Sequence, residues 1–96
     1  MDLNRELRSA INTGNVWLGA NQCCEAVAAG KAELVLLARN CPAAVVEEID
    51  RGEVPTYHFD GTNSDLGMAC GKPFGISAVT ILDGGSSEIL GLRASC

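Results

Sequence analysis

Leu34-Val35-Leu36-Leu37-Ala38 is an uninterrupted apolar run of strand length, and it is the stretch that decides the fold. A strand with one face in water alternates apolar and polar residues, whereas a strand covered on both faces does not. We therefore expect this run to be a central strand of a sheet. The segments on either side of it must supply the elements that cover its two faces.

Two helices and a strand are expected before this run. Apolar residues at helical spacing predict a first helix over residues 2–13, with Gly14 as its stop. The apolar residues 16–18 are typical of a short buried strand. Asn21 is a favourable N-cap for a second helix, and Gly30 is suited to the left-handed position at the end of that helix.

Two helices and two strands are expected after the run. Pro42 favours the first turn of a third helix, which extends through about Arg51. Residues 56–59 alternate polar and apolar and predict a strand near an edge of the sheet. Thr62 has an aspartate three residues later, which is the spacing of a capping box and predicts the start of a fourth helix. Residues 76–82 predict the last strand.

The order of these elements predicts an α/β fold, with helices on both faces of one sheet. Crossover helices imply mainly parallel neighbours, although a mixed sheet is also compatible with the pattern. The 96 residues predict a single domain, 1–96. Three apolar residues of the C-terminal segment are expected to pack back on this domain: Ile89, Leu90 and Leu92.

The composition is that of an ordinary globular chain, with 47% hydrophobic and 20% charged residues. No apolar run approaches the roughly 20 residues that a membrane span needs. The first six residues alternate charges instead of presenting a basic head and an apolar block, which does not fit a secretory signal. We expect a cytoplasmic protein that does not bind membranes.

Five scattered cysteines, no C-x-x-C pair and a single histidine argue against a zinc site and against a disulfide framework. We expect reduced thiols that pack as small hydrophobes. Cys23 lies near the start of the second helix, but no general base stands beside it in the sequence. We therefore expect neither a metal nor a catalytic cysteine.

No catalytic set can be assembled from the sequence. The stretch from Gly67 to Lys72 differs from a phosphate-binding G-x-x-x-x-G-K-[ST] loop in its glycine spacing, and Pro73 stands where that loop needs Ser or Thr. Paired carboxylates, a serine with a base and a dinucleotide fingerprint are missing as well. The chain is expected to be a binding module without a cofactor or a small-molecule substrate.

The loops at the predicted strand ends carry the residues suited to binding. Gly19-Ala20-Asn21-Gln22 offers helix N-terminal N–H groups and two amide side chains, which hold anions or base edges. Arg39 and Asn40 stand at another strand end. Gly71-Lys72-Pro73-Phe74-Gly75-Ile76 combines a cation, an aromatic ring and an aliphatic side chain, as in sites for unstacked bases. Taken alone, Phe74 and Ile76 are more typical of core residues than of a binding loop.

The net charge of −5 is an objection to nucleic-acid binding, since phosphate neutralisation normally supplies much of the affinity. Glu25 follows the Gly19–Gln22 turn within the second helix and has the wrong sign for a phosphate partner. An acidic surface that binds a basic protein is therefore an alternative. A small-molecule enzyme of the α/β type is a third reading, for which the sequence offers no cleft residues.

The sequence resembles, in register over nearly its whole length, the family of the archaeal large-subunit ribosomal protein thirty and its eukaryotic counterpart. The resemblance rests on these segments: Thr13-Gly14-Asn15-Val16, Leu18-Gly19-Ala20-Asn21-Gln22, Ala26-Val27, Gly30-Lys31-Ala32-Glu33-Leu34-Val35, Ala38-Arg39-Asn40-Cys41-Pro42, Tyr57-His58-Phe59-Asp60-Gly61-Thr62, Asp65-Leu66-Gly67 and Gly71-Lys72-Pro73. It implies a three-layer α/β/α sandwich with a four-stranded mixed sheet, in a superfamily that binds kink-turns in RNA.

The resemblance also implies roles for individual residues. Asn21 and Gln22 would read the sheared G·A pairs beside the kink, and Phe74 with Ile76 would lie against an extruded base. The phosphate contacts would come from Lys31 and Lys72. The complete set of RNA-binding residues implied in this way is Gly19, Ala20, Asn21, Gln22, Lys31, Arg39, Asn40, Lys72, Phe74 and Ile76.

The function implied is that of a structural, non-enzymatic constituent of the large ribosomal subunit in the cytoplasm, in contact with ribosomal RNA and neighbouring ribosomal proteins. Two features depart from the family pattern. Glu25, Ala28 and Ala29 replace residues that are usually basic, and the segment from Ala43 to Val54 is about four residues short. We therefore expect weak, salt-dependent RNA affinity in isolation. The alternative is a protein-interaction module of the same fold that has lost most of its RNA affinity.

Overall fold

The computed structural model describes residues 3–85, 87–89 and 91. Within these ranges helices and strands alternate along the chain in the predicted order. The elements are α1 (Leu3–Thr13), β1 (Asn15–Leu18), α2 (Ala20–Ala28), β2 (Leu34–Leu37), α3 (Ala43–Arg51), β3 (Thr56–His58), α4 (Asn63–Ala69) and β4 (Ala78–Asp83).

The four strands form one mixed sheet in the order β1-β4-β2-β3, so the predicted α/β fold is confirmed. Leu36 of β2 lies opposite Tyr57 in the parallel pair with β3 and opposite Val79 in the antiparallel pair with β4. Because β4 is also antiparallel to β1, the first three strands share one direction. The expectation of mainly parallel neighbours is wrong, since β4 separates β1 from β2 and runs against both.

The reversal of β4 follows from the shape of the segment before it. Helix α4 has seven residues, about 10 Å of helix, which is too short to carry the chain to the other end of the sheet. The loop after α4 folds back along it: the N–H of Lys72 donates to the carbonyl of Gly67 (2.9 Å), and the N–H of Ile76 donates to that of Asn63 (2.9 Å). The chain therefore re-enters the sheet at the end where β3 finishes, and β4 runs in the opposite direction to β3.

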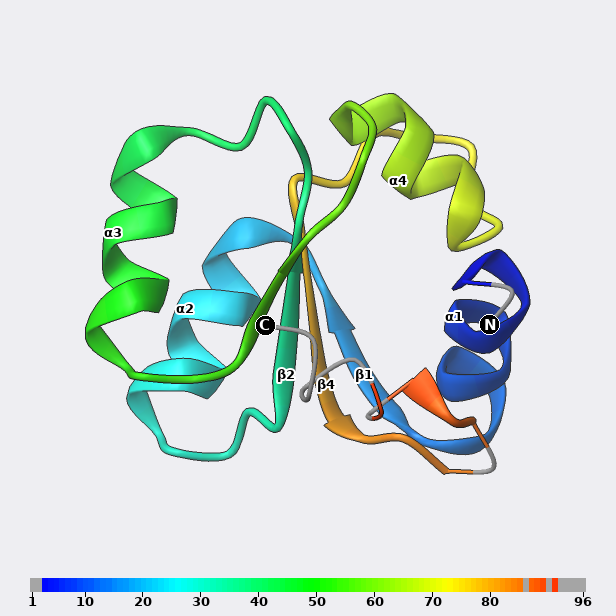
Figure 1. Cartoon of the computed structure of the whole chain (residues 1–96), viewed down its shortest axis with the longest axis horizontal. Coiled ribbons are helices and arrows are strands. Elements are labelled where there is room, and N and C mark those ends of the chain that lie inside the picture. The colour runs from blue at the N-terminus through cyan, green and yellow to red at the C-terminus, as the bar shows by residue number, and fades with distance from the viewer. Residues whose placement is uncertain (1–2, 86, 90, 92–96) are drawn as a thin grey trace.

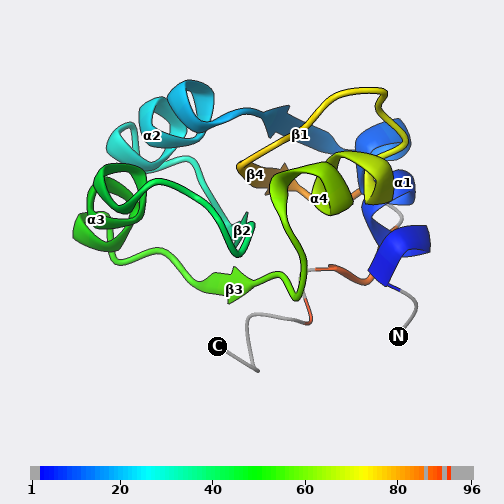
Figure 2. The same ribbon diagram turned by 90° about the horizontal axis from the view of Figure 1, so that it is seen from above.

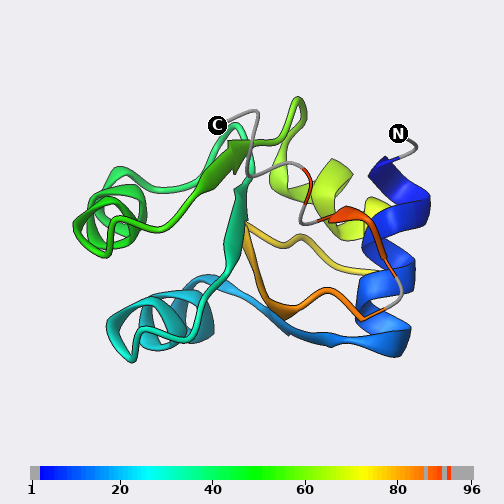
Figure 3. The same cartoon turned by 60° about the horizontal axis from the view of Figure 1, so that its bottom comes forward.

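Helices cover both faces of the sheet (Figures 1 and 3): α2 and α3 lie on one side, and α1 and α4 on the other. The side chains of β2 divide between the two layers. Leu34 and Leu36 belong to the core cluster under α1 and α4, whereas Val35 and Leu37 belong to the cluster under α2 and α3. All four are buried, which confirms β2 as the central strand predicted from its apolar run.

Both edge strands are less buried than the two central ones. Strand β3 lies at an edge as predicted. Strand β1 was expected to be buried, but its residues are only half-buried or exposed because it forms the opposite edge. Ile76, which was expected to open the last strand, precedes β4 and packs in the core.

The helix ends match the sequence signals in part. The capping box at α4 is confirmed, with the N–H of Thr62 donating to Asp65 Oδ2 (3.0 Å), and Gly30 is left-handed with φ 71°. Asn21 is not the N-cap of α2, because Gly19 takes that position with φ 111°, a conformation that favours glycine. Pro42 likewise stands one place earlier than expected, as the N-cap of α3.

The described part of the C-terminal segment packs against α1. Ile89 is fully buried, as predicted, and Ser87 Oγ donates to the carbonyl of Glu6 (2.7 Å). Leu90 and Leu92 lie outside the described residues. No helix in the ranges that the structure describes has the length and apolar character to cross a membrane.

Gly67 allows the loop after α4 to approach the helix, and we predict that Gly67→Ala destabilises the protein. A Cβ at this position would overlap the carbonyl oxygen of Phe74. We expect a loss of about 1–3 kcal/mol in the free energy of unfolding in urea, which outweighs the gain of roughly 0.5–1 kcal/mol that alanine brings to an open helix position. Met68→Ala, at the exposed neighbouring position, is the control and should change stability little.

Candidate nucleic-acid interface

The loops predicted to bind lie where the strands end, on one side of the molecule (Figure 2). This end of the sheet carries the carboxyl ends of β1, β2 and β3 and the start of β4. Backbone hydrogen bonds join its loops: the N–H of Gly19 donates to the carbonyl of Ala78 (2.9 Å), and the N–H of Arg39 donates to that of Gly61 (2.7 Å). Segments far apart in the sequence thus form one continuous surface.

The start of α2 presents open hydrogen-bond donors on this surface. The N-cap residue, Gly19, has no side chain to cap the helix, and no acidic residue stands in the first turn. The N–H groups of that turn are therefore available to an acceptor, and the helix dipole favours a negative one. Asn21 and Gln22 are exposed, whereas Glu25 lies beyond the first turn. The conflict of charge expected from Glu25 is weaker than its place in the sequence suggested.

Arg39 and Asn40 both engage neighbouring loops. Arg39 Nη2 lies 2.6 Å from Asp60 Oδ1, in an exposed ion pair that neutralises its charge locally. Asn40 Oδ1 accepts the N–H of Asn63 (2.8 Å), and its Nδ2 donates to Asn63 Oδ1 (3.2 Å). The Asn40 side chain therefore satisfies an N–H in the first turn of α4. The contacts of Asp60 and Asn63 were not predicted, because no local pattern connects these residues to their partners.

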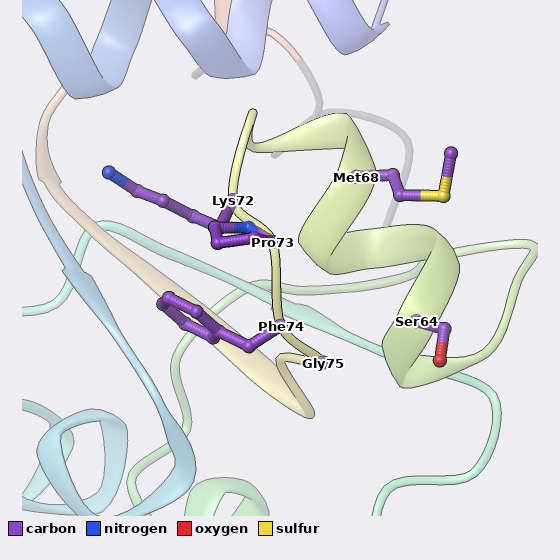
Figure 4. Close-up of a pocket in the computed structure, with 6 residues that line it drawn as sticks. All are labelled: Ser64, Met68, Lys72, Pro73, Phe74 and Gly75. Atoms are coloured by element: carbon purple, nitrogen blue, oxygen red, sulfur yellow. The ribbon is translucent and has the colours of Figure 1, made fainter.

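The loop after α4 exposes an aromatic ring. Phe74 is 58% exposed, while Ile76 is 3% exposed and packs beneath the surface, which leaves Phe74 as the apolar side chain that this loop presents. Lys72 and Phe74 extend to the same side of the loop, away from Met68 (Figure 4). Together with Ser64, Pro73 and Gly75 these residues line a hollow of about 240 Å³. Met68, which also lines this hollow, is 69% exposed.

Lys31 is not brought to this surface. It stands between α2 and β2, at the amino end of β2, whereas Arg39 and Asn40 follow the carboxyl end of the same strand. The two ends of this strand lie at opposite ends of the sheet (Figure 1). Lys72 is thus the predicted phosphate contact that lies beside the other predicted residues.

The thiols are poorly suited to nucleophilic chemistry. Burial raises the pKa of Cys23 to about 12 and that of Cys70 to about 11, and it also raises the pKa values of Cys24 and Cys41. All four are free and protonated at neutral pH. Among the residues described, no group of three or more His, Cys, Asp or Glu side chains is placed to hold a metal ion.

The fold defines the class as a small α/β domain with helices on both faces of a mixed sheet. The chain belongs to the family described as ribosomal protein L7Ae/L30e/S12e/Gadd45, whose sequence model matches residues 1–91. The resemblance inferred from the sequence is thereby confirmed.

Several archaeal relatives match over nearly the full chain, and each is named large ribosomal subunit protein eL30. The protein from Methanosarcina mazei is 42% identical over 94 residues, which cover 98% of this chain and 91% of the relative. That from Methanospirillum hungatei is 45% identical over 93 residues, with 96% and 98% covered. That from Methanosphaerula palustris is 42% identical over 94 residues, with 97% and 98% covered. These names describe ribosomal proteins and not enzymes.

We predict that Gly19→Asn destabilises the protein more than Gly30→Asn does. A Cβ at either glycine meets nothing within 4 Å, so the backbone conformation alone decides the cost. Asparagine tolerates the left-handed helical region expected at Gly30, but φ 111° with ψ 151° at Gly19 is a region nearly exclusive to glycine. We expect a loss of about 1–3 kcal/mol at Gly19 in urea unfolding. Equal losses would show that the start of α2 adjusts without strain.

We also predict that Asn40→Ala lowers stability by roughly 0.5–2 kcal/mol, because the N–H of Asn63 loses its side-chain acceptor. Asn40→Asp is the matched variant: it keeps that acceptor and adds a negative charge that the helix dipole favours near the start of α4, and this offsets the loss of the Nδ2 donor to Asn63 Oδ1. The midpoints of urea unfolding should rank Asp close to the native chain and Ala below both. A native midpoint for Asn40→Ala would mean that the contact contributes nothing to stability.

Proposed function

We propose that this chain is a structural, RNA-binding protein of the large ribosomal subunit, acting as a single domain in the cytoplasmic ribosome. Its membership of the family and its full-length similarity to proteins named large ribosomal subunit protein eL30 support this role. The partners are ribosomal RNA and the ribosomal proteins beside it. No catalytic step is part of the proposal.

Within this role, the ligand is a kink-turn of ribosomal RNA bound by the loops at the strand ends. The observation that carries the proposal is the uncapped start of α2, with exposed Asn21 and Gln22, on the same sheet edge as the exposed ring of Phe74. A tightly bent RNA concentrates phosphate charge and exposes unstacked bases on one side. Amides can read base edges there, while an aromatic ring stacks on the extruded base.

The charges on this surface limit the affinity. Arg39 is paired with Asp60, and Lys31 stands at the other end of the sheet, before β2. Base edges and shape must therefore contribute more to recognition than phosphate neutralisation does. We expect binding to be weak for the isolated chain and reduced further by salt, with neighbouring ribosomal proteins holding it in place. Nanomolar binding that salt barely affects would contradict this expectation.

A second candidate is a protein-interaction module that binds a basic partner. The exposed carboxylates of Glu47, Glu48 and Asp50 on α3 favour it, although Glu48 is paired with Arg51. Sedimentation of cell extract separates the two functions. Recovery of the chain with large ribosomal subunits supports the RNA-binding role, and recovery only with a non-ribosomal partner supports the alternative.

The RNA-binding role predicts that Asn21→Ala weakens binding to a synthetic kink-turn RNA by about 1–3 kcal/mol, the value of a base-edge contact. Because Asn21 is exposed and does not cap α2, the free energy of unfolding of the Asn21→Ala variant should differ from that of the native chain by less than about 0.5 kcal/mol. Asn15→Ala, at the opposite end of β1, is the matched control and should leave RNA binding unchanged. Native affinity in the Asn21 variant would remove this residue from the site.

A further inference from the structure

A second hollow lies beside the Phe74 loop, between α1 and the turn that ends α4. Its volume is about 230 Å³, and its lining comes from α1 (Arg8, Ile11, Asn12) and from Cys70, Gly71 and Lys72. Lys72 also lines the hollow next to Phe74. The two hollows therefore share Lys72, with Phe74 lining one of them and residues of α1 lining the other.

The second hollow concentrates positive charge in an acidic protein. Among the described residues, neither Arg8 nor Lys72 has a carboxylate within 4 Å, in contrast to the paired Arg39 and Arg51. Burial raises the pKa of Cys70 to about 11 even though both cations lower it, so the thiol between them stays neutral at pH 7. Two positive side chains thus line the same hollow, and among the described residues neither forms an ion pair.

Arg8 also lines a hollow that contains two acidic residues. Asp60 and Asp65 line a separate hollow with Arg8, and each has a partner of its own. Asp60 pairs with Arg39, while Asp65 accepts the N–H of Thr62. Neither carboxylate lines the hollow that Arg8 shares with Lys72.

Backbone geometry brings Arg8 close to this turn. Gly71 is left-handed with φ 77°, and a Cβ built on it would lie 3.7 Å from Arg8 Nε. Arg8 Nη2 also makes a long contact of 3.4 Å with the carbonyl of Met68. The guanidinium is therefore placed beside the turn, and most of its five N–H donors remain open to a ligand.

We propose that the RNA strand continues from the extruded base at Phe74 across this second hollow, and that Arg8 and Lys72 hold one of its backbone phosphates between them. The proposal rests on the kink-turn binding proposed above and extends the RNA surface from the strand-end loops to α1. Arginine suits this contact because its planar fork matches two phosphate oxygens, while lysine adds a point charge. The contact positions the RNA and reads no base.

The test compares Arg8→Gln with Arg51→Gln in titrations of a synthetic kink-turn RNA. Both substitutions remove one positive charge from an exposed position, but Arg51 lies on α3, away from the hollow. Loss of one phosphate contact should weaken binding roughly five- to tenfold at about 0.1 M salt and lower the salt slope by roughly 0.7–0.9. Arg51→Gln should change the affinity less than about twofold, because salt at this concentration screens a charge that lies away from the bound RNA.

A second measurement locates the contact on the RNA. A single uncharged methylphosphonate linkage is placed in turn at each position flanking the extruded base. At one linkage, the effect of Arg8→Gln should disappear, because the phosphate charge that Arg8 contacts is already absent. Arg8→Lys, which keeps the charge and loses the fork, should fall between the native chain and Arg8→Gln. Thermal unfolding of each variant checks that its fold is intact.

The possible outcomes separate this inference from the function on which it rests. If the native chain does not bind the kink-turn RNA, both are overturned. If it binds and Arg8→Gln behaves like Arg51→Gln, only the phosphate site on α1 is overturned. If Arg8→Gln weakens binding but no methylphosphonate cancels its effect, Arg8 acts through the general field of the protein, and the site is likewise overturned.

Discussion

The burial of β2 on both faces is the constraint on which the rest of the structure depends. Its side chains alternate between the core under α1 with α4 and the core under α2 with α3. Each buried Leu or Val contributes roughly 1.5–3 kcal/mol, which is large beside the 5–15 kcal/mol that separates folded from unfolded domains. Both helical layers are thus anchored on one strand, and the loops that follow the strand ends inherit their positions from it.

The candidate site results from the return of the chain after α4. Because that segment comes back to the edge it left, the loops that follow three strands meet the loop that precedes the fourth. Where these loops meet, Asp60 pairs with Arg39 and reduces the positive charge of the surface. Exposed amides and an aromatic ring then dominate the centre of the surface, and unpaired positive charge lies at its margin, at Arg8 and Lys72.

The sequence predicted what depends on local signals. The order of elements, the double burial of β2, the capping box at Thr62 and the left-handed Gly30 were all correct. Strand order and the direction of β4 were not predictable, because periodicity reports burial and not pairing. The exposure of Phe74 against the burial of Ile76 depends on how the loop folds onto α4. The bond between Asn40 and Asn63 joins residues 23 positions apart.

The place of β4 in the sheet has a consequence for the order of folding. Strand β1 lies at an edge, and its strand partner β4 is the last strand of the sheet along the chain. Contacts between distant segments form slowly, since the intervening chain must first be ordered. During synthesis, β1 and the bond that fixes Gly19 to Ala78 must wait until β4 has emerged. A nascent chain therefore completes its α2 donor surface only after all four strands of the sheet have been synthesised.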